Sequence, residues 1–171
     1  HDTSLDRDFK YLLKQYFRLR INSVCTHRLA CGKEAGTFLF GNRDFKVIPN
    51  AIDAEKFYFN KDLRDEKRKE LGLVGKFVVG HVGRLSYQKN HKFLIEIFNE
   101  LLKKESDSIL LLVGVGEKEE ELRRQVKNLG IEDKVHFLGN RSDVNELYQA
   151  MDVFVMRSFF EGIPVVGVEA Q

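Results

Sequence analysis

The sequence predicts an α/β protein, in which a parallel β-sheet is covered by helices on both faces. Two observations predict this fold class. Short continuous apolar runs, typical of strands buried on both faces, recur from about residue 77 onwards. Amphipathic helical patterns separate these runs, and a repeated order of strand and helix favours parallel pairing through right-handed crossovers.

The composition is that of an ordinary folded domain, with 171 residues of which 43% are apolar and 32% are charged. A chain of this length can bury one sizeable core. Its apolar runs fall well short of the about 18 residues that a membrane-spanning helix needs, and the N-terminus lacks the cleavage pattern of a signal peptide. Cys25 and Cys31 lack the spacing of a metal site, so we expect free thiols in a reducing compartment.

Apolar residues recur at helical spacing over residues 5–22, which predicts an amphipathic helix. Lys10, Lys14 and Arg18 fall on one ridge of that helix. Residues 1–50 hold nine Lys and Arg against five Asp and Glu, so the front of the chain is its basic part. Two interpretations of the ridge stay open: a solvated face, which is the commoner meaning, or a contact with an anionic membrane surface.

A turn-rich stretch at residues 49–53 marks the expected boundary between two domains. Before it we expect a strand at 28–30, a helix at 33–40 and a strand at 46–48. The boundary therefore assigns residues 1–48 to one domain and residues 49–171 to another. The first residue is not methionine and Gln171 falls within an expected helix, so we expect a fragment of a longer protein.

The second domain shows a regular order of strand and helix. Its buried strands are expected at 77–82, 109–113, 135–138 and 153–156, and its helices at 62–71, 90–104, 117–129 and 143–150. In a parallel sheet of this kind, ligands bind at the carboxyl ends of the strands. The search for functional residues therefore concentrates on the loops that follow the strands.

The loop after the first of these strands carries two cations. Gly83 removes a side chain where a ligand would approach the backbone, and Arg84 and Lys89 place two positive charges ahead of the next helix. A diphosphate, and a nucleoside diphosphate as it leaves, needs such a pair of cations. A basic surface loop is the alternative, but the position of both cations at one strand end favours function.

The loop after the second strand begins as a dinucleotide-binding fingerprint would, with Gly114 and Gly116. Glu119 stands where the third glycine belongs, and neighbouring glutamates would repel a phosphate. We therefore exclude a nicotinamide or flavin site and keep the two glycines as places where a ligand approaches the backbone. Of two histidines nearby, His81 is expected in the core and His91 at a helix start.

The loop after the third strand is short of charged groups at its beginning. Gly139 opens this loop, in which backbone groups can pair with the edge of a base. Ser142 or Asp143 is expected to cap the helix that follows.

Two carboxylates flank the start of the last helix, Glu161 ahead of it and Glu169 within it. Pro164 is expected at the first helical position, where unpaired N–H groups make an anion site. Carboxylates repel phosphate and pair with hydroxyls, so the two acids and the helix start together outline a nucleotide sugar. Solvated charges near a helix N-terminus are the alternative for both acids.

These motifs, in this order, resemble the retaining glycosyltransferases of family 4, which have the two-domain GT-B architecture. The resemblance covers most of residues 23–171, and its most specific part is the pair of glutamates with seven residues between them. It is nearest to bacterial enzymes of capsular or exopolysaccharide assembly. It implies that residues 1–48 end an acceptor domain and that residues 49–171 form a Rossmann-like donor-binding domain, truncated at its C-terminus.

The resemblance also implies a role for each motif. Arg84 and Lys89 would bind the donor diphosphate and stabilise the leaving group, while Glu161 would hold hydroxyls of the transferred sugar, and these three are the expected catalytic residues. Glu169 would hold the ribose. The remaining donor contacts would come from Gly83, Leu138, Gly139, Gly162, Ile163, Pro164 and Val165. No metal or other cofactor is implied, because the cations and the helix start take that role.

The expected function is transfer of a hexose, with retention, from a nucleotide-diphosphate sugar to a hydroxyl acceptor such as a lipid-linked saccharide. The expected setting is cell-surface polysaccharide synthesis, in the cytoplasm or at the inner face of the membrane, with no nucleic-acid partner. The chain alone is expected to bind donor without turning it over. Two alternatives stay open: a nucleotide-sugar epimerase of the same architecture, and a non-catalytic nucleotide- or partner-binding domain. The base, the sugar and the acceptor also stay open.

Overall fold

The computed structural model describes residues 4–159 and 164–171, and within the first helix it leaves out the side chains of residues 4–11, 14 and 18. The chain divides into two compact units, His1–Ala51 and Ile52–Gln171. The division falls inside the turn-rich stretch at residues 49–53, three residues after the boundary expected from the sequence. Each unit is described by itself below.

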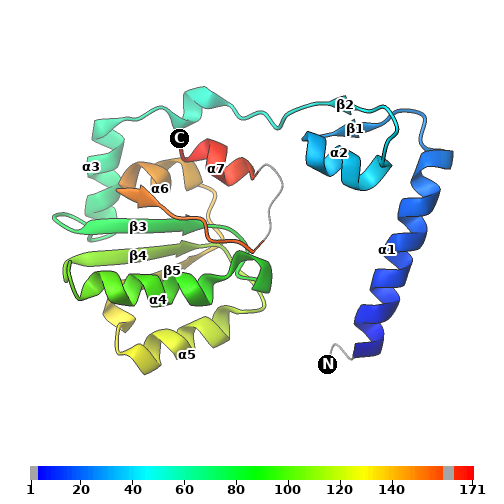
Figure 1. Cartoon of the computed structure of the whole chain (residues 1–171). Helices are drawn as coiled ribbons and strands as arrows, with labels where there is room; N and C mark the ends of the chain where they lie inside the picture. Colours follow the sequence, from blue (N-terminus) through cyan, green and yellow to red (C-terminus); the bar gives the residue numbers. More distant parts are fainter. Residues whose placement is uncertain (1–3, 160–163) are drawn as a thin grey trace. The chain divides into compact units, whose positions relative to one another are not determined.

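The first unit holds a long helix and a small helix beside a two-stranded parallel sheet (Figure 1). Its elements are α1 (Ser4–Val24), β1 (Leu29–Ala30), α2 (Lys33–Phe40) and β2 (Lys46–Val47). The predicted order of elements is therefore confirmed for this part. The side chains of the basic ridge, Lys10, Lys14 and Arg18, lie outside the described side chains. Across the helices that the structure describes, none is both long and apolar enough to cross a membrane.

The second unit is built on a four-stranded sheet with the order β5-β4-β3-β6, and all three neighbouring pairs are parallel. Its strands are β3 (Phe77–Val82), β4 (Ser108–Val113), β5 (Val135–Gly139) and β6 (Val153–Phe154). The helices are η1 (Ala54–Phe57), α3 (Lys61–Glu70), η2 (Tyr87–Lys89), α4 (His91–Leu102), α5 (Glu119–Leu129), η3 (Glu132–Lys134), α6 (Val144–Ala150) and α7 (Val165–Glu169). The predicted alternation of strand and helix is confirmed.

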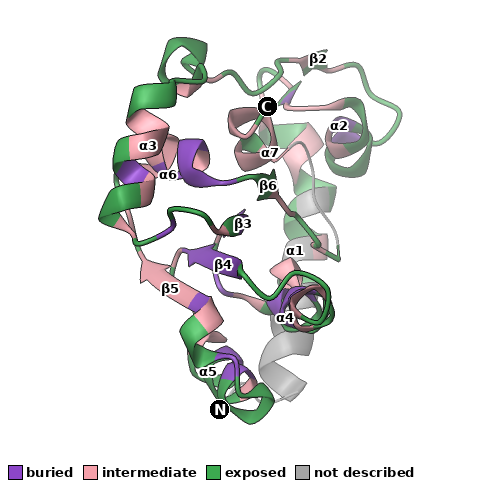
Figure 2. Ribbon diagram, turned by 90° about the vertical axis from the view of Figure 1, so that its left-hand side faces the viewer, coloured by how far each residue is buried: buried purple, intermediate pink, exposed green. Residues whose placement is uncertain are grey.

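Helices cover both faces of this sheet (Figure 1). In β4 the side chains alternate, so that Leu110 and Leu112 pack with α4 and α5 while Ile109 and Leu111 pack with residues of α6. All of β4 is buried, which explains why the strand reads as a continuous apolar run rather than an alternating one. Figure 2 shows the buried residues gathered along the central strands and on the helix sides that face them.

Element ends differ from the prediction at a few positions. The ladder of β6 ends at Phe154, although the N–H of Val155 still donates to the carbonyl of Gly80 at 2.9 Å. Helix α5 begins at Glu119, because the chain ahead of it follows the backbone of the β3 loop, with the N–H of Lys118 donating to the carbonyl of Leu85 at 2.9 Å. Pro164 is extended and precedes α7, so it does not occupy the first helical position.

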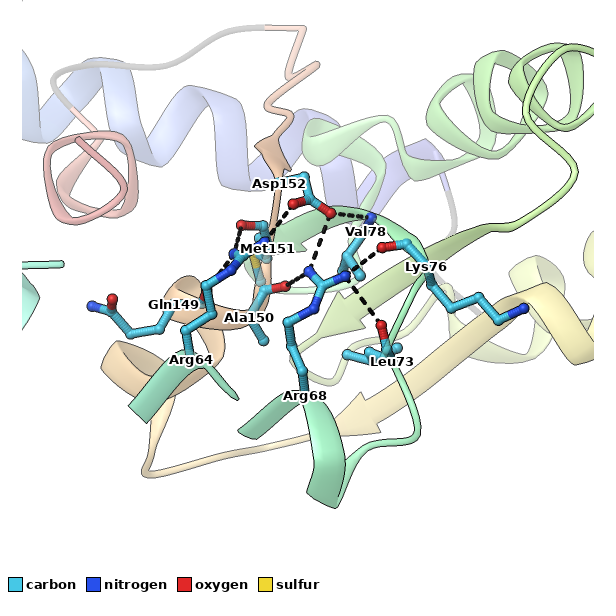
Figure 3. A network of polar contacts seen from close by, with 9 residues as sticks. All are labelled: Arg64, Arg68, Leu73, Lys76, Val78, Gln149, Ala150, Met151 and Asp152. Atoms are coloured by element: carbon cyan, nitrogen blue, oxygen red, sulfur yellow. Dashed lines mark hydrogen bonds and ion pairs between the residues drawn. The ribbon is translucent and has the colours of Figure 1, made fainter. Parts of the chain in front are cut away.

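A polar network joins α3 to the sheet (Figure 3). The Asp152 carboxylate, just ahead of β6, binds Arg64 at 2.5 Å and Arg68 at 3.2 Å, and it accepts a hydrogen bond from the N–H of Val78 at 2.7 Å. Arg68 also donates to the carbonyl of Leu73 at 3.1 Å. These contacts fix the amino ends of β3 and β6 against α3. The loops in which a ligand is expected follow the carboxyl ends of the strands, at the opposite end of the sheet.

Candidate functional site at the strand ends

A cavity of about 470 Å³ opens at the carboxyl ends of β3, β4 and β5. We call it the strand-end cavity. Residues of three loops line it, among them Gly83, Arg84, Gly114, Gly116, Asn140 and Arg141. Its position agrees with the rule that parallel sheets bind ligands where their strands end. Gly83 and Arg84, which the sequence singled out, thus lie where a ligand would be held.

The two glycines after β4 bring backbone against backbone. A Cβ at Gly114 would lie 2.1 Å from the carbonyl oxygen of Gly83, and a Cβ at Gly116 would lie 2.3 Å from that of Leu85. Gly114 also has a φ of +130°, which side chains disfavour. The sequence interpretation kept these glycines as places where a ligand approaches. The structure adds a second reason for them, because the chain's own β3 loop occupies the Cβ side of each glycine. Both glycines also line the cavity, so the approach of a ligand to their backbone stays a prediction.

Arg84, which lines the cavity, is exposed and forms an ion pair with Glu117. Its Nη2 lies 3.2 Å from Oε2 of Glu117, in the loop that leads from β4 to α5. The pKa of Glu117 is lowered, first by a hydrogen bond with its own backbone and further by the Arg84 charge, so its carboxylate is ionised at neutral pH. The sequence treated Glu117 only as a residue that repels phosphate. Its pairing with Arg84 depends on β3 and β4 being neighbours, which no local pattern reveals.

Lys89 lies on the same loop as Arg84, at the end of η2. A Cβ at Gly83 would come within 3.4 Å of Cε of Lys89, so the lysine stem passes directly over the glycine. The same Cβ would lie 3.2 Å from Nε2 of His81. A Cβ at position 83 would therefore be in van der Waals contact with Lys89 and would crowd His81 slightly. His81 itself is fully buried, and its Nδ1 donates to the carbonyl of Val155 at 2.8 Å, so the predicted core position is confirmed.

The loop after β5 presents side chains that the sequence analysis missed. Asn140 and Arg141 line the strand-end cavity, whereas the carbonyl of Gly139 accepts a hydrogen bond from the N–H of Gly114 at 2.8 Å. Leu138 packs against the core on the α6 side of the sheet. The carbonyl of Gly139 therefore already has a partner within the chain, and Asn140 and Arg141 are the groups of this loop that face the cavity.

Arg141 is held in place by a two-point ion pair. Its Nε and Nη2 lie 2.7 and 2.6 Å from the two carboxylate oxygens of Asp143. Asp143 also binds the buried Lys67 at 3.0 Å, and these partners hold the pKa of its carboxyl well below the usual range. Asp143 stands at the N-cap position of α6, but its side chain makes no capping hydrogen bond. The predicted capping hydrogen bond from the Asp143 side chain is therefore wrong, because Arg141 and Lys67 bind its two carboxylate oxygens instead.

Glu169 is the last residue of α7, and its carboxylate accepts a hydrogen bond from the hydroxyl of Tyr148 at 3.2 Å. Burial, and then the charge of Glu169, raise the pKa of Tyr148, so its hydroxyl stays a donor. Glu169 lines a separate cavity of about 150 Å³, together with Phe57 and Tyr148. The described residues therefore do not bring Glu169 to the lining of the strand-end cavity, and its ribose contact stays a prediction.

The remaining predicted donor contacts concern the chain between β6 and α7. Glu161, Gly162 and Ile163 lie outside the described residues, so their roles stay predictions. Pro164 and Val165 are described, and neither lines the strand-end cavity. Across the two described ranges, no three His, Cys, Asp or Glu side chains gather as a metal site would need.

Comparison with known families shows which protein family the chain belongs to. Residues 63–171 match the family described as glycosyl transferases group 1. The chain belongs to this family. The match begins within α3 and includes every loop of the strand-end cavity. Membership in glycosyl transferases group 1 therefore rests on the same part of the chain that forms the candidate site.

Individual relatives in glycosyl transferases group 1 agree with this assignment. The chain is 36% identical over 180 residues to a protein from Bacillus subtilis named putative glycosyltransferase EpsF, a match that covers 100% of this chain and 47% of that protein. It is 36% identical over 129 residues to an Escherichia coli galactosyltransferase that acts on a diphosphoundecaprenol-linked sugar, covering 73% of this chain and 33% of that protein.

Solved structures agree on the fold. Anabaena HepE in complex with UDP and glucose superposes with a TM-score of 0.81 at 29% identity, over 92% of this chain and 45% of that one. WaaG, a glycosyltransferase of lipopolysaccharide biosynthesis, superposes with a TM-score of 0.80 at 20% identity, over 98% of this chain and 47% of that one. Both neighbours share the fold of this chain, and the predicted parallel, Rossmann-like sheet is confirmed. The chain spans about half the length, or less, of these relatives.

Proposed function

We propose that this chain is the donor-binding part of a retaining glycosyltransferase of family 4, which moves a hexose from a nucleotide-diphosphate sugar to a hydroxyl acceptor. One observation carries the proposal: Gly83 and Arg84 line the cavity where β3, β4 and β5 end, and the stem of Lys89, from the same loop, lies beside Gly83. The crystal structures of HepE with UDP and with UDP-glucose support the same ligand class.

In this proposal Arg84 and Lys89 bind the diphosphate of the donor. Charge-assisted hydrogen bonds from a guanidinium and an ammonium favour phosphate oxygens, and they stabilise the negative charge that develops as the nucleoside diphosphate leaves. Arg141, fixed on Asp143, joins Arg84 in the cavity lining as a second cation there. Because these cations supply the counter-charge, we propose that the donor binds without a metal ion.

For the other donor contacts we propose the roles that the family resemblance implies. Glu161 would bind hydroxyls of the transferred sugar, and Glu169, oriented by the hydroxyl of Tyr148, would bind the ribose. We propose cell-surface polysaccharide as the product, a lipid-linked saccharide as the acceptor, and the inner face of the membrane as the place of reaction. A relative named amylovoran biosynthesis glycosyltransferase AmsD, 36% identical over 90 residues, supports the polysaccharide setting.

Calorimetry on the chain tests the donor site directly. UDP should bind more tightly than UMP, by about 10-fold for each cation that meets the second phosphate. Arg84→Ala and Lys89→Ala should each lower that ratio by about 10-fold. Lys103→Ala should leave it unchanged, because Lys103 is exposed at the end of α4 and pairs with Glu100. Equal affinity for UDP and UMP would contradict the proposed diphosphate site.

A second experiment separates the rival functions. Binding of UDP without chemistry would be all that a non-catalytic nucleotide-binding domain shows. An epimerase would change the configuration of the sugar, whereas a transferase releases UDP and forms a glycoside. Product analysis of the full-length protein with UDP-, GDP- and ADP-sugars distinguishes these outcomes and identifies the base and the sugar.

A further inference from the structure

Lys89 lies on a short stretch of chain between two buried residues. Leu85 ahead of it is fully buried, and His91 after it is 2% exposed. Residues 86–90 between them include η2, a single turn of 3-10 helix that ends at Lys89. We call residues 86–90 the η2 arch. Arg84 lies on the other side of Leu85, so the two cations of this loop are held by different parts of the chain.

The η2 arch is weakly held from within. The N–H of Lys89 donates to the carbonyl of Ser86 and the N–H of Asn90 to that of Tyr87, both at 3.2 Å, which is long for a hydrogen bond between backbone groups. Such 3-10 turns have poorer hydrogen-bond geometry than an α-helix. Asn90 also has a left-handed backbone, with a φ of +53°, which costs free energy. The position of Lys89 therefore depends on contacts from outside the arch.

Towards α5 the η2 arch faces a cavity of about 280 Å³. Helix α5 is fixed instead to the chain ahead of the arch, through the hydrogen bond from the N–H of Lys118 to the carbonyl of Leu85. Support for the arch therefore comes from another side. The cavity is lined on the arch by Ser86, Tyr87 and Asn90, and at the start of α5 by Lys118, Glu121 and Leu122.

Phe159, in the segment that follows β6, provides this support. Its N–H donates to the carbonyl of Gln88 at 2.9 Å. Its ring stacks on the ring of Tyr87, with the centroids 5.1 Å apart and an interplanar angle of 28°. Phe159 and Tyr87 are nevertheless 51% and 68% exposed. Because the two rings bury little area against the core, they contribute more to the placement of the η2 arch than to the stability of the fold.

The segment that presents Phe159 is itself fixed to the rest of the unit. Nδ1 of the buried His81 donates to the carbonyl of Val155 at 2.8 Å. Further along, the Arg157 guanidinium lies over the ring of Phe93 in α4, 5.1 Å from its centroid, which is a cation–π contact. Phe159 is therefore a firm support on which the η2 arch can rest.

The direction of the arch decides where the Lys89 ammonium lies. The stem of Lys89 passes beside Gly83, since a Cβ there would lie 3.4 Å from Cε of Lys89, and Gly83 lines the strand-end cavity. A charge-assisted hydrogen bond to a phosphate oxygen needs a distance of about 2.7–2.9 Å. A movement of the arch by about 1 Å would therefore weaken the contact between Lys89 and a phosphate.

We propose that Tyr87 and Phe159 are positioning residues for Lys89. Their stacked rings hold the η2 arch on the segment after β6, so that the Lys89 ammonium meets the second phosphate of the donor. The inference rests on the proposed function, because that function gives Lys89 a diphosphate to bind. Arg84 lies outside the arch and pairs with Glu117, so its contact with the donor does not depend on the two rings.

Calorimetry on the chain with UDP and UMP tests the role of the rings. Tyr87→Ala should lower the ratio of UDP affinity to UMP affinity by about 2- to 10-fold, the range that an aromatic pair accounts for. Phe159→Ala should lower it by a similar factor, whereas Tyr87→Phe keeps the ring and should preserve the ratio. Tyr58→Ala is the control, because Tyr58 is 71% exposed and follows η1 rather than lying in the η2 arch. UMP lacks the second phosphate, so its affinity should stay the same in every variant.

A double-mutant cycle shows whether Tyr87 acts through Lys89. In a chain that already carries Lys89→Ala, Tyr87→Ala should not lower the ratio further, because the contact that it disturbs is gone. In a chain that carries Arg84→Ala, Tyr87→Ala should keep its full effect. Additive effects of Tyr87→Ala and Lys89→Ala would overturn the inference. An equal loss of UDP and UMP affinity in Tyr87→Ala, together with a lower Tm, would also overturn it, because it would mean that the rings only stabilise the fold.

The same measurements separate this inference from the proposed function. Equal affinity of the unchanged chain for UDP and UMP would contradict the diphosphate site, and with it any role of Tyr87 and Phe159 there. Tighter binding of UDP that Tyr87→Ala leaves unchanged would reject the positioning role alone and keep the diphosphate site.

Discussion

The Arg84 guanidinium lies 3.2 Å from the Glu117 carboxylate, and the pair spans the loops that follow β3 and β4. The side chains are 75% and 54% exposed. In the proposed donor complex Arg84 binds a phosphate, so Glu117 competes with the ligand for the same cation. Without nucleotide, the carboxylate holds the arginine at the mouth of the strand-end cavity.

Removal of the competing charge should strengthen nucleotide binding. We expect Glu117→Gln to raise the affinity for UDP by about 2- to 5-fold, the range that an exposed ion pair accounts for. The gain should shrink as salt screens the charges. Glu119→Gln is the matched control, because Glu119 pairs with Arg123 at 2.8 Å on α5 rather than with Arg84. Calorimetry in which both variants bind UDP with the same affinity would refute the competition.

A side chain at Gly114 should damage the cavity wall. Gly114→Ala places a Cβ 2.1 Å from the Gly83 carbonyl oxygen, at a residue with a φ of +130°. We expect a loss of at least about 2 kcal/mol in the free energy of unfolding, because neither backbone segment can move without breaking the sheet end. UDP affinity should fall as well, since the displaced loop carries Arg84.

Gly75→Ala separates the clash from backbone strain. Gly75 has a φ of +74° and nothing within 4 Å of a Cβ built on it, so only the strain of the left-handed backbone applies. That strain costs about 1 kcal/mol. Chemical denaturation in which both variants lose the same stability would show that the Gly83–Gly114 approach does not matter.

Asp152 should make stability depend on pH in the acid range. Burial opposes ionisation of its carboxyl, but the hydrogen bond from Val78 and the pairs with Arg64 and Arg68 outweigh it, so the pKa is lowered. A pKa that is lower in the folded chain than the about 3.9 of an unfolded aspartate stabilises the fold at neutral pH. That contribution disappears as the pH falls below about 4 and through the folded pKa.

Replacement of that carboxylate should therefore matter most at neutral pH. We expect Asp152→Asn to lose about 2–3 kcal/mol at pH 7, since Arg64 and Arg68 lose their partner at a half-buried site. The difference from the unchanged protein should narrow towards pH 3. Asp107→Asn serves as the control, because Asp107 pairs with Lys76 while 72% exposed, and its Tm should change little. A pH-independent difference for Asp152→Asn would argue against a role of its charge.

The sequence by itself determined which segments become strands and which become helices. Apolar runs at 77–82 and 109–113 form β3 and β4, because local hydrophobicity and the order of elements leave few other ways to bury them. It also placed Gly83 and Arg84 at a strand end, because a parallel sheet puts its loops there. Predictions of this kind depend only on residues near one another in the chain.

The tertiary structure alone decided which loops meet. The strand order β5-β4-β3-β6 brings Gly114 against Gly83, Glu117 against Arg84, and Asn140 with Arg141 into the same cavity. The two members of each contact, Gly83 with Gly114 and Arg84 with Glu117, lie more than 30 residues apart in sequence. Each is a common residue type in a polar loop. No local pattern distinguishes a glutamate that repels phosphate from one that pairs with an arginine, because that difference depends on which strands are neighbours.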